Sequence, residues 1–241
     1  MKKLLLLAIG LVFLTSCQFK EEITFNKNGS GEYKLSIDMG GFMSMTKEMG
    51  QQTDSLKKGK KEVKDTVYRL SELFKKDSEQ WQRLTDKEKE LLKALKDVSV
   101  VLHMDENNDQ MEMAYVYPFK KTKDLNNILE KLKQVEKLRN NNVEDDAMKN
   151  MPKTEVSYVF KKHKFQRKVK LTKPVDKPTQ KNENLFNMMQ YKLVYHFPYP
   201  IKSVSYKEAM LSADRKTLII EAPLSQVSEN PEILDFEVKF D

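Results

Sequence analysis

Few side chains in this chain of 241 residues are suited to covalent or metal chemistry: one cysteine and three histidines. Cys17 carries a nucleophilic thiol, and a single cysteine cannot form a disulfide within the chain. His103, His163 and His196 lie far apart in the sequence, and none has the spacing of a metal site. We therefore predict no catalytic residue and no metal site, and we expect the chemistry to be a modification of Cys17.

The N-terminus has the features of an export signal. A basic start, Met1-Lys2-Lys3, precedes the apolar run 4–14 (LLLLAIGLVFL). A helix that spans a bilayer needs about 20 apolar residues, so this run is too short to be one. Its length and basic start are typical of a signal peptide. We expect residues 1–16 to be removed and residues 17–20 to form a short tether.

The four residues that end this segment, Leu14, Thr15, Ser16 and Cys17, resemble the lipobox of bacterial lipoproteins. In those proteins the cysteine thiol receives a diacylglyceryl group, the signal peptidase cuts before it, and in many species the new amine is acylated. The resemblance implies that Cys17 is the lipidation site and that Leu14, Thr15 and Ser16 are recognised by the peptidase. Two or more acyl chains hold a protein stably at a membrane. We expect no cofactor besides this covalent lipid.

Alternating apolar residues predict strands in the mature chain. Residues 21–26 and 31–38 flank the turn pair Asn28-Gly29, which predicts a β-hairpin. Residues 98–105 and 110–119 predict a second hairpin, and residues 154–160 and 164–172 a third strand pair. Further strands are predicted near residues 192–197, 203–207, 216–222 and 234–240.

Helical spacing of apolar residues predicts helices over residues 62–97 and from Thr122 to Leu138. Thr85 and Glu88 form a capping-box pattern within the first. Because strands joined by hairpins run antiparallel, we predict an α+β fold, with an antiparallel sheet built from hairpins and helices packed on one face. The ectodomain is expected to span residues 21–241. The loop 173–184 is the candidate sub-boundary, which leaves open whether there are one or two domains.

A methionine-rich segment follows the first hairpin. Residues 39–50 (MGGFMSMTKEMG) contain four of the thirteen methionines, and Phe42, Met45 and Met49 share one helical face. Methionine is a pliable filler of cores and binding sites. No histidine or second cysteine lies nearby to complete a soft-metal site. Phe42, Met45 and Met49 are therefore candidates for the lining of an apolar pocket.

A basic segment, residues 161–181, contains nine lysines and arginines and one acid. It is either a solvent-exposed edge strand that lysines protect from aggregation, or a surface for an anionic headgroup or polysaccharide. The candidate residues for anionic-surface binding are Lys161, Lys162, Lys164, Arg167, Lys168 and Lys170. Nucleic acid is not an expected partner, because a protein with this leader is exported.

Two longer stretches, EEITFNKNGSGEYKLSIDM and FPYPIKSVSYKEAMLSADRKTLIIEAPLSQV, resemble the opening hairpin and late strands of LppM-like bacterial lipoproteins. That resemblance implies an α+β ectodomain that binds lipid or glycolipid, and it carries over no catalytic residue. The stretch CQFKEE, with Lys20, Glu21 and Glu22, resembles the surface-export signal of Bacteroidota lipoproteins.

These observations predict a non-enzymatic envelope lipoprotein with a binding or envelope-assembly role. The expected location is the outer membrane of a bacterial envelope, on its periplasmic or surface side. The expected partners are the membrane, through the lipid anchor, and an anionic lipid, a glycolipid or another envelope protein. The alternative is an envelope hydrolase that uses scattered carboxylates, since the distance between two carboxylates in space is not visible in a sequence.

Overall fold

The computed structural model describes residues 18–38, 40, 63–74, 78–105, 107–139, 153–173, 187 and 189–241. The described strands form a large sheet of eight strands and a small sheet of four. The strands of the large sheet are β1 (Gln18–Phe25), β2 (Gly31–Asp38), β3 (Val63–Arg69), β4 (Ser99–Asp105), β5 (Gln110–Phe119), β8 (Gln190–His196), β10 (Met210–Leu211) and β11 (Thr217–Pro223). Those of the small sheet are β6 (Lys153–Lys161), β7 (Lys164–Lys173), β9 (Ile201–Val204) and β12 (Phe236–Phe240).

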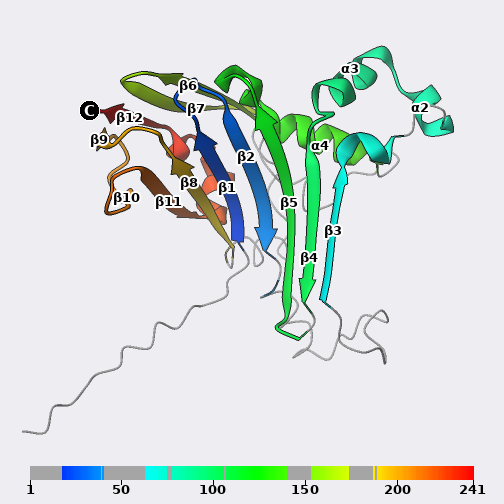
Figure 1. The fold of residues 1–241 in the computed structure, drawn as a ribbon, viewed down its shortest axis with the longest axis horizontal. Coiled ribbons are helices and arrows are strands. Elements are labelled where there is room, and N and C mark those ends of the chain that lie inside the picture. Colours follow the sequence, from blue (N-terminus) through cyan, green and yellow to red (C-terminus); the bar gives the residue numbers. More distant parts are fainter. Residues whose placement is uncertain are drawn as a thin grey trace, which may run out of the picture.

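The helices are short (Figure 1). They are α2 (Glu79–Arg83), α3 (Asp86–Ala94), α4 (Ile128–Arg139) and α7 (Leu224–Glu229), with 3₁₀ turns at Leu70–Leu73, Thr122–Leu125 and Pro231–Leu234. The predicted α+β class is therefore wrong, because the protein is predominantly β. The layer that packs on the large sheet contains the small sheet as well as helices, whereas the sequence pattern predicts helices alone in that layer.

The strand order of the large sheet is β10-β11-β8-β1-β2-β5-β4-β3, and that of the small sheet is β6-β7-β12-β9. The predicted hairpins β1–β2, β4–β5 and β6–β7 are confirmed, each as an antiparallel pair. Gly29 lies in the first turn with a φ of 81°, a conformation that glycine adopts without strain. The sheet is not wholly antiparallel, however, since β1 and β8 run parallel. Parallel neighbours need a long connection, and most of the chain separates these two strands.

The helix predicted over residues 62–97 is wrong in its first part. Val63–Arg69 is strand β3, which pairs antiparallel with β4 and forms one end of the large sheet. Val63 and Val67 lie four residues apart, and a separation of four fits both the helical and the strand repeat. β-branched valines favour the strand. The later part does contain helices, and the predicted capping box is confirmed: Glu88 N–H donates to Thr85 Oγ1, and Thr85 N–H donates to Glu88 Oε2.

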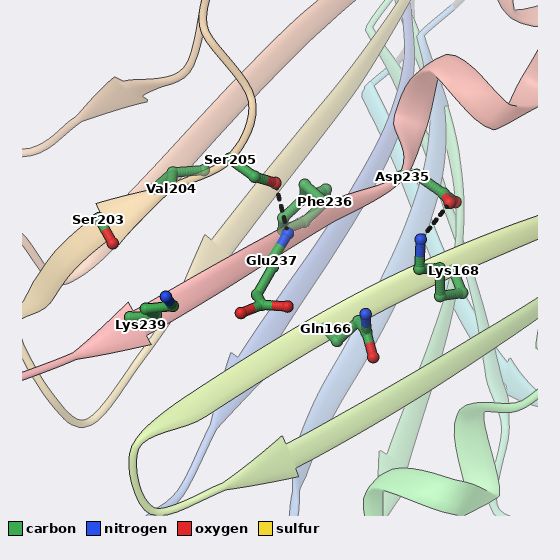
Figure 2. A pocket seen from close by; sticks show the side chains of 9 residues that line it. All are labelled: Gln166, Lys168, Ser203, Val204, Ser205, Asp235, Phe236, Glu237 and Lys239. Carbon is green, nitrogen blue, oxygen red and sulfur yellow. Dashed lines mark hydrogen bonds and ion pairs between the residues drawn. The ribbon is translucent and has the colours of Figure 1, made fainter.

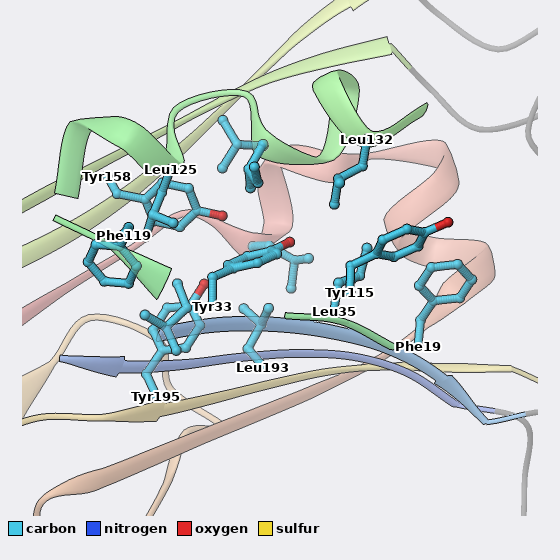
Figure 3. Close-up of a cluster of buried hydrophobic side chains, with 14 of the residues drawn as sticks. Phe19, Tyr33, Leu35, Tyr115, Phe119, Leu125, Leu132, Tyr158, Leu193 and Tyr195 are labelled. Carbon is cyan, nitrogen blue, oxygen red and sulfur yellow. The ribbon is translucent and has the colours of Figure 1, made fainter. Parts of the chain in front are cut away.

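The core lies between one face of the large sheet and a covering layer made of the small sheet, α4 and α7. Tyr33, Leu35 and Leu193 point from the large sheet toward Leu125 and Leu132 of the helical layer (Figure 3). Aromatic rings join the two sheets, with Phe165 of β7 in edge-to-face contact with Tyr195 of β8 at 5.5 Å. This packing brings the small sheet against the β1–β8 half of the large one.

The chain passes between the two sheets several times after β7. Strands β8, β10 and β11 join the large sheet, while β9 and β12 join the small one. Strands on either side of the loop 173–184 therefore share both sheets, and most of that loop lies outside the described residues. Within the described part of the chain, no helix is long and apolar enough to cross a membrane.

Candidate functional site

The basic segment of the sequence forms strand β7, and its side chains alternate between two environments. Lys164, Gln166, Lys168 and Lys170 lie on the outer face of the small sheet, whereas Phe165, Arg167 and Val169 are buried. Arg167 is only 2% exposed, so its assignment to an anionic-binding surface is wrong. β7 is also no edge strand, because β6 and β12 flank it on either side.

Acidic side chains on β12 and directly before it lie beside two outward lysines of β7. Lys164 Nζ lies 2.6 Å from Glu237 Oε2, and Lys168 Nζ lies 2.9 Å from Asp235 Oδ2. The bond to Asp235 raises the pKa of Lys168, and the bond from Lys164 lowers the pKa of Glu237. Glu155 of β6 lies opposite Lys170. The folded surface therefore places acids beside two of the outward lysines and opposite a third, which the basic composition of the segment does not show.

This outer face contains a hollow of about 450 Å³ (Figure 2). We call this outer face of the small sheet the polar face. The polar side chains that line its hollow are Gln166, Lys168, Ser203, Ser205, Asp235, Glu237 and Lys239. Ser205 Oγ accepts a hydrogen bond of 2.9 Å from Glu237 N–H, which ties the end of β9 to β12. A second hollow, of about 340 Å³, shares Lys168 and is lined by the side chains of β6, β7 and the Asn126-Asn127 turn.

The polar face combines amide, hydroxyl, carboxylate and ammonium groups. Together these can both donate and accept hydrogen bonds over a broad area. An isolated anion would meet a carboxylate beside Lys164 and another beside Lys168, whereas a molecule with many hydroxyl groups could bond to both kinds of side chain. The chemistry of the face therefore suits a polyhydroxylated ligand such as a glycan better than a bare anion.

A second group of polar residues is buried between the two sheets around Glu21, which points inward from β1 and is 2% exposed. Tyr158 O–H donates to its Oε1 at 2.9 Å, Tyr191 O–H donates to its Oε2 at 3.1 Å, and Tyr195 O–H also donates to Oε1. Arg167 Nη2 lies 3.4 Å from Oε2, and Nη1 donates to the Leu234 carbonyl at 3.1 Å. We call Glu21, Tyr158, Arg167, Tyr191 and Tyr195 the Glu21 cluster.

No catalytic or metal motif in the sequence marks this cluster, but the alternation of residues along its strands does. Glu21 alternates in register with Ile23 and Phe25, and Arg167 with Phe165 and Val169, so each charge is in step with core residues. A charged residue on a buried face requires a partner. The alternation is enough to indicate that both are buried, although it does not show that they pair.

The environment of the cluster strongly favours neutral tyrosines. Burial, followed by the negative charge of Glu21, raises the pKa values of Tyr33, Tyr158, Tyr191 and Tyr195 well above 10. Among the described residues, Arg167 Nε within the cluster has no hydrogen-bond partner, and neither has the buried Tyr33 Oη, which lies outside it. The cluster is thus a polar network in which most, but not all, groups are satisfied.

We expect these tyrosines to make the protein unstable in alkali. Because their folded pKa values exceed the ordinary value of 10, the stability they contribute is complete below pH 10 and is lost as the pH rises above it. Each would remove about 1.4 kcal/mol per pH unit above that point. A titration of tyrosinate absorbance should show these four ionising only as circular dichroism reports unfolding. Ionisation of all nine tyrosines near pH 10 with the fold intact would contradict this.

The remaining predicted site residues lie elsewhere. Leu14, Thr15, Ser16 and Cys17 of the lipidation signal, and Phe42, Met45 and Met49 of the predicted apolar pocket, lie outside the described residues. His103 bonds to Asp65 at 2.7 Å and His196 to Glu22 at 2.9 Å, each through a ring nitrogen and a carboxylate oxygen. In the described part of the chain, no group of three or more histidine, cysteine or acidic side chains could hold a metal ion.

Fold and site together define a predominantly β protein of two packed sheets, with a polar hollow on the smaller one. No family model matches the chain, and no curated protein matches it in sequence. Among solved structures, it is similar to the NMR structure of the folded domain of LppM from Mycobacterium tuberculosis. The TM-score is 0.35 and the identity 8%, over 93% of this chain and 90% of that one. At this level the similarity is weak, and it leaves the family of the chain open.

Proposed function

We propose that this protein is a lipid-anchored bacterial envelope lipoprotein whose ectodomain binds, without catalysis, the sugar portion of an envelope glycolipid or polysaccharide. The observation that carries the proposal is the hollow of about 450 Å³ on the polar face. Its hydroxyl and amide groups lie beside carboxylates and ammonium groups, and this combination suits a ligand with many hydroxyl groups.

The anchor supports this proposal because it would bring the domain close to such a ligand. Strand β1 begins at Gln18, the residue directly after Cys17. A lipid on Cys17 would therefore be attached next to a central strand of the large sheet, with no long linker between them. Under the proposal, the ectodomain lies against the surface of its membrane, which is the outer membrane on its periplasmic or external side.

The alternative of a carboxylate hydrolase has no comparable support. The two buried carboxylates of the described residues, Glu21 and Glu136, both accept hydrogen bonds from tyrosine hydroxyls. Glu21 is in addition paired with Arg167. A general acid or base must reach its substrate, and both of these carboxylates are buried within the core.

Replacing Gln166 and Ser203 by alanine should weaken glycan binding about tenfold. Each side chain is expected to contribute a hydrogen bond worth roughly 0.5–1.5 kcal/mol, and neither substitution removes a buried apolar group. The measurement is calorimetric titration of the mature chain carrying Cys17→Ser with oligosaccharides selected from an array of bacterial surface glycans. The control is Lys87→Ala, an exposed change on α3, which should leave the affinity unchanged.

Vesicles provide the test between a glycan and a bare anionic headgroup. Anionic phospholipid vesicles without sugar should bind the same chain weakly, and neutralising Lys161, Lys164 and Lys170 should weaken that binding further. If no glycan binds while anionic vesicles bind tightly, the ligand is a charged headgroup and the glycan proposal is rejected. If both probes fail, the polar face is not a binding site for either.

A further inference from the structure

A small cavity lies on the inner side of β7, opposite the polar face. Its volume is about 60 Å³, and its walls include Phe19 of β1, Val156 of β6, Val169 of β7 and Val227 of α7. The cavity thus lies where the two sheets, α4 and α7 meet. Space of this size is enough for about two water-sized groups. It can therefore accept the end of a small molecule, but not the body of a large one.

Polar groups reach the wall of this cavity from the Glu21 cluster. Arg167 and Tyr191 both line it, together with the buried hydroxyl residues Thr154 and Ser228. Arg167 Nη1 and Nη2 are engaged by the Leu234 carbonyl and Glu21, but no group among the described residues accepts from Nε–H. A buried donor without an acceptor is unfavourable, so a ligand whose oxygen accepts from this N–H group binds more tightly.

The charges around the cavity favour a neutral ligand. Two cations line the cavity, and each is already balanced. Arg167 pairs with Glu21, whose carboxylate is bound by three tyrosine hydroxyls, and Lys133 Nζ lies 3.0 Å from Glu130 Oε1. A second anion would have to leave water and approach the Glu21 carboxylate in a medium of low dielectric constant, which is costly. A neutral oxygen carries no such cost.

We propose that this cavity binds the oxygen-bearing end of a small neutral amphiphile, an alcohol or an ester, with the oxygen accepting from Arg167 Nε–H and the carbon chain against Phe19, Val156 and Val169. The site differs from the polar face in position and in ligand chemistry, since it lies on the opposite side of β7. The proposal does not depend on the proposed glycan function, and either can fail alone.

The probe is 1-butanol, compared with 1-chlorobutane and butyrate, added to the mature chain carrying Cys17→Ser. The readout is the displacement of the methyl NMR signals of Val156, Val169 and Leu224, which line the cavity. Butanol should bind about fivefold more tightly than chlorobutane, which has the same carbon chain but a poor acceptor. It should bind at least tenfold more tightly than butyrate.

Val227→Leu supplies the variant, because the added methylene fills part of the cavity without disturbing Arg167. It should weaken butanol binding at least fivefold. Gln226→Leu, the matching change at the exposed neighbouring position of α7, should have no effect. The proposal is overturned if butanol leaves the three methyl signals unmoved, if both leucine variants bind it like the parent chain, or if chlorobutane or butyrate binds as well as butanol.

Discussion

Replacing Glu21 by leucine should destabilise the protein by about 3–5 kcal/mol, because it leaves the buried Arg167 guanidinium without its counter-charge. Three buried tyrosine hydroxyls also lose their acceptor. A typical domain has only about 5–15 kcal/mol of stability, so the variant is expected to be mostly unfolded at elevated temperature or low denaturant. The measurement is equilibrium unfolding in urea, followed by circular dichroism.

The matched control for this variant is Glu22→Leu, the next residue of the same strand. Glu22 lies on the outer face, where it forms an ion pair with Lys20 and a hydrogen bond with His196 Nε2. Loss of half-exposed pairs of this kind costs about 1 kcal/mol or less. The comparison therefore separates burial of the charge from the mere loss of a carboxylate on β1. Equal losses of stability at positions 21 and 22 would show that the Glu21 cluster does not stabilise the fold.

A double variant tests the pairing itself. Glu21→Leu combined with Arg167→Met removes both charges, and replacing a buried ion pair by apolar residues is often close to neutral. We expect the double variant to be more stable than Glu21→Leu alone, although below the parent chain because the tyrosine hydroxyls remain without an acceptor. Additive losses would mean that Glu21 and Arg167 do not interact.

Replacing Cys17 by serine should abolish lipidation, so that the purified chain lacks the mass of the lipid and keeps residues 1–16. A hydroxyl is a much poorer nucleophile than a thiol, so no diacylglyceryl group would be attached and the peptidase would lack its lipidated substrate. Since two or more acyl chains provide the stable anchor, the unlipidated chain should leave the outer-membrane fraction and be held only by its uncleaved leader. The measurement is fractionation of a bacterial host, with the mass of the purified chain reporting the attached lipid.

Lys20→Ala provides the control for this experiment. It changes a residue three positions after Cys17, within β1, and leaves the lipobox pattern untouched. The variant should therefore remain in the membrane fraction with its lipid. A Cys17→Ser chain that stays membrane-bound, with an unchanged mass, would show that anchoring does not depend on the cysteine.

Much of the local structure can be predicted from the sequence because it depends on neighbouring residues. The alternation of Ile23 with Phe25 and the turn at Asn28-Gly29 specify the β1–β2 hairpin within about twenty residues. The capping box of Thr85 and Glu88 is similarly local. The spacing of Val63 and Val67 is ambiguous, because four residues fit either repeat. Pairing with β4, a tertiary interaction, selects the strand.

The candidate site shows the opposite case, in which distant residues decide the outcome. Lys164 and Lys168 belong to a strongly basic segment of the sequence, but Glu237 and Asp235 arrive beside them from about seventy residues further along the chain. Coulomb attraction depends on distance in space, so no count along the sequence could show this neutralisation.

The sequence by itself predicts the lipidation signal. It also determined the hairpins and which side chains of each strand share a face, since these follow from neighbouring residues and the two-residue repeat of a strand. Only the tertiary structure decided that the protein is predominantly β and that β1 pairs in parallel with β8. It also decided that Glu21 meets Arg167 inside the core. The physical reason is that burial and charge pairing depend on which elements pack together, and here those elements are separated by more than a hundred residues.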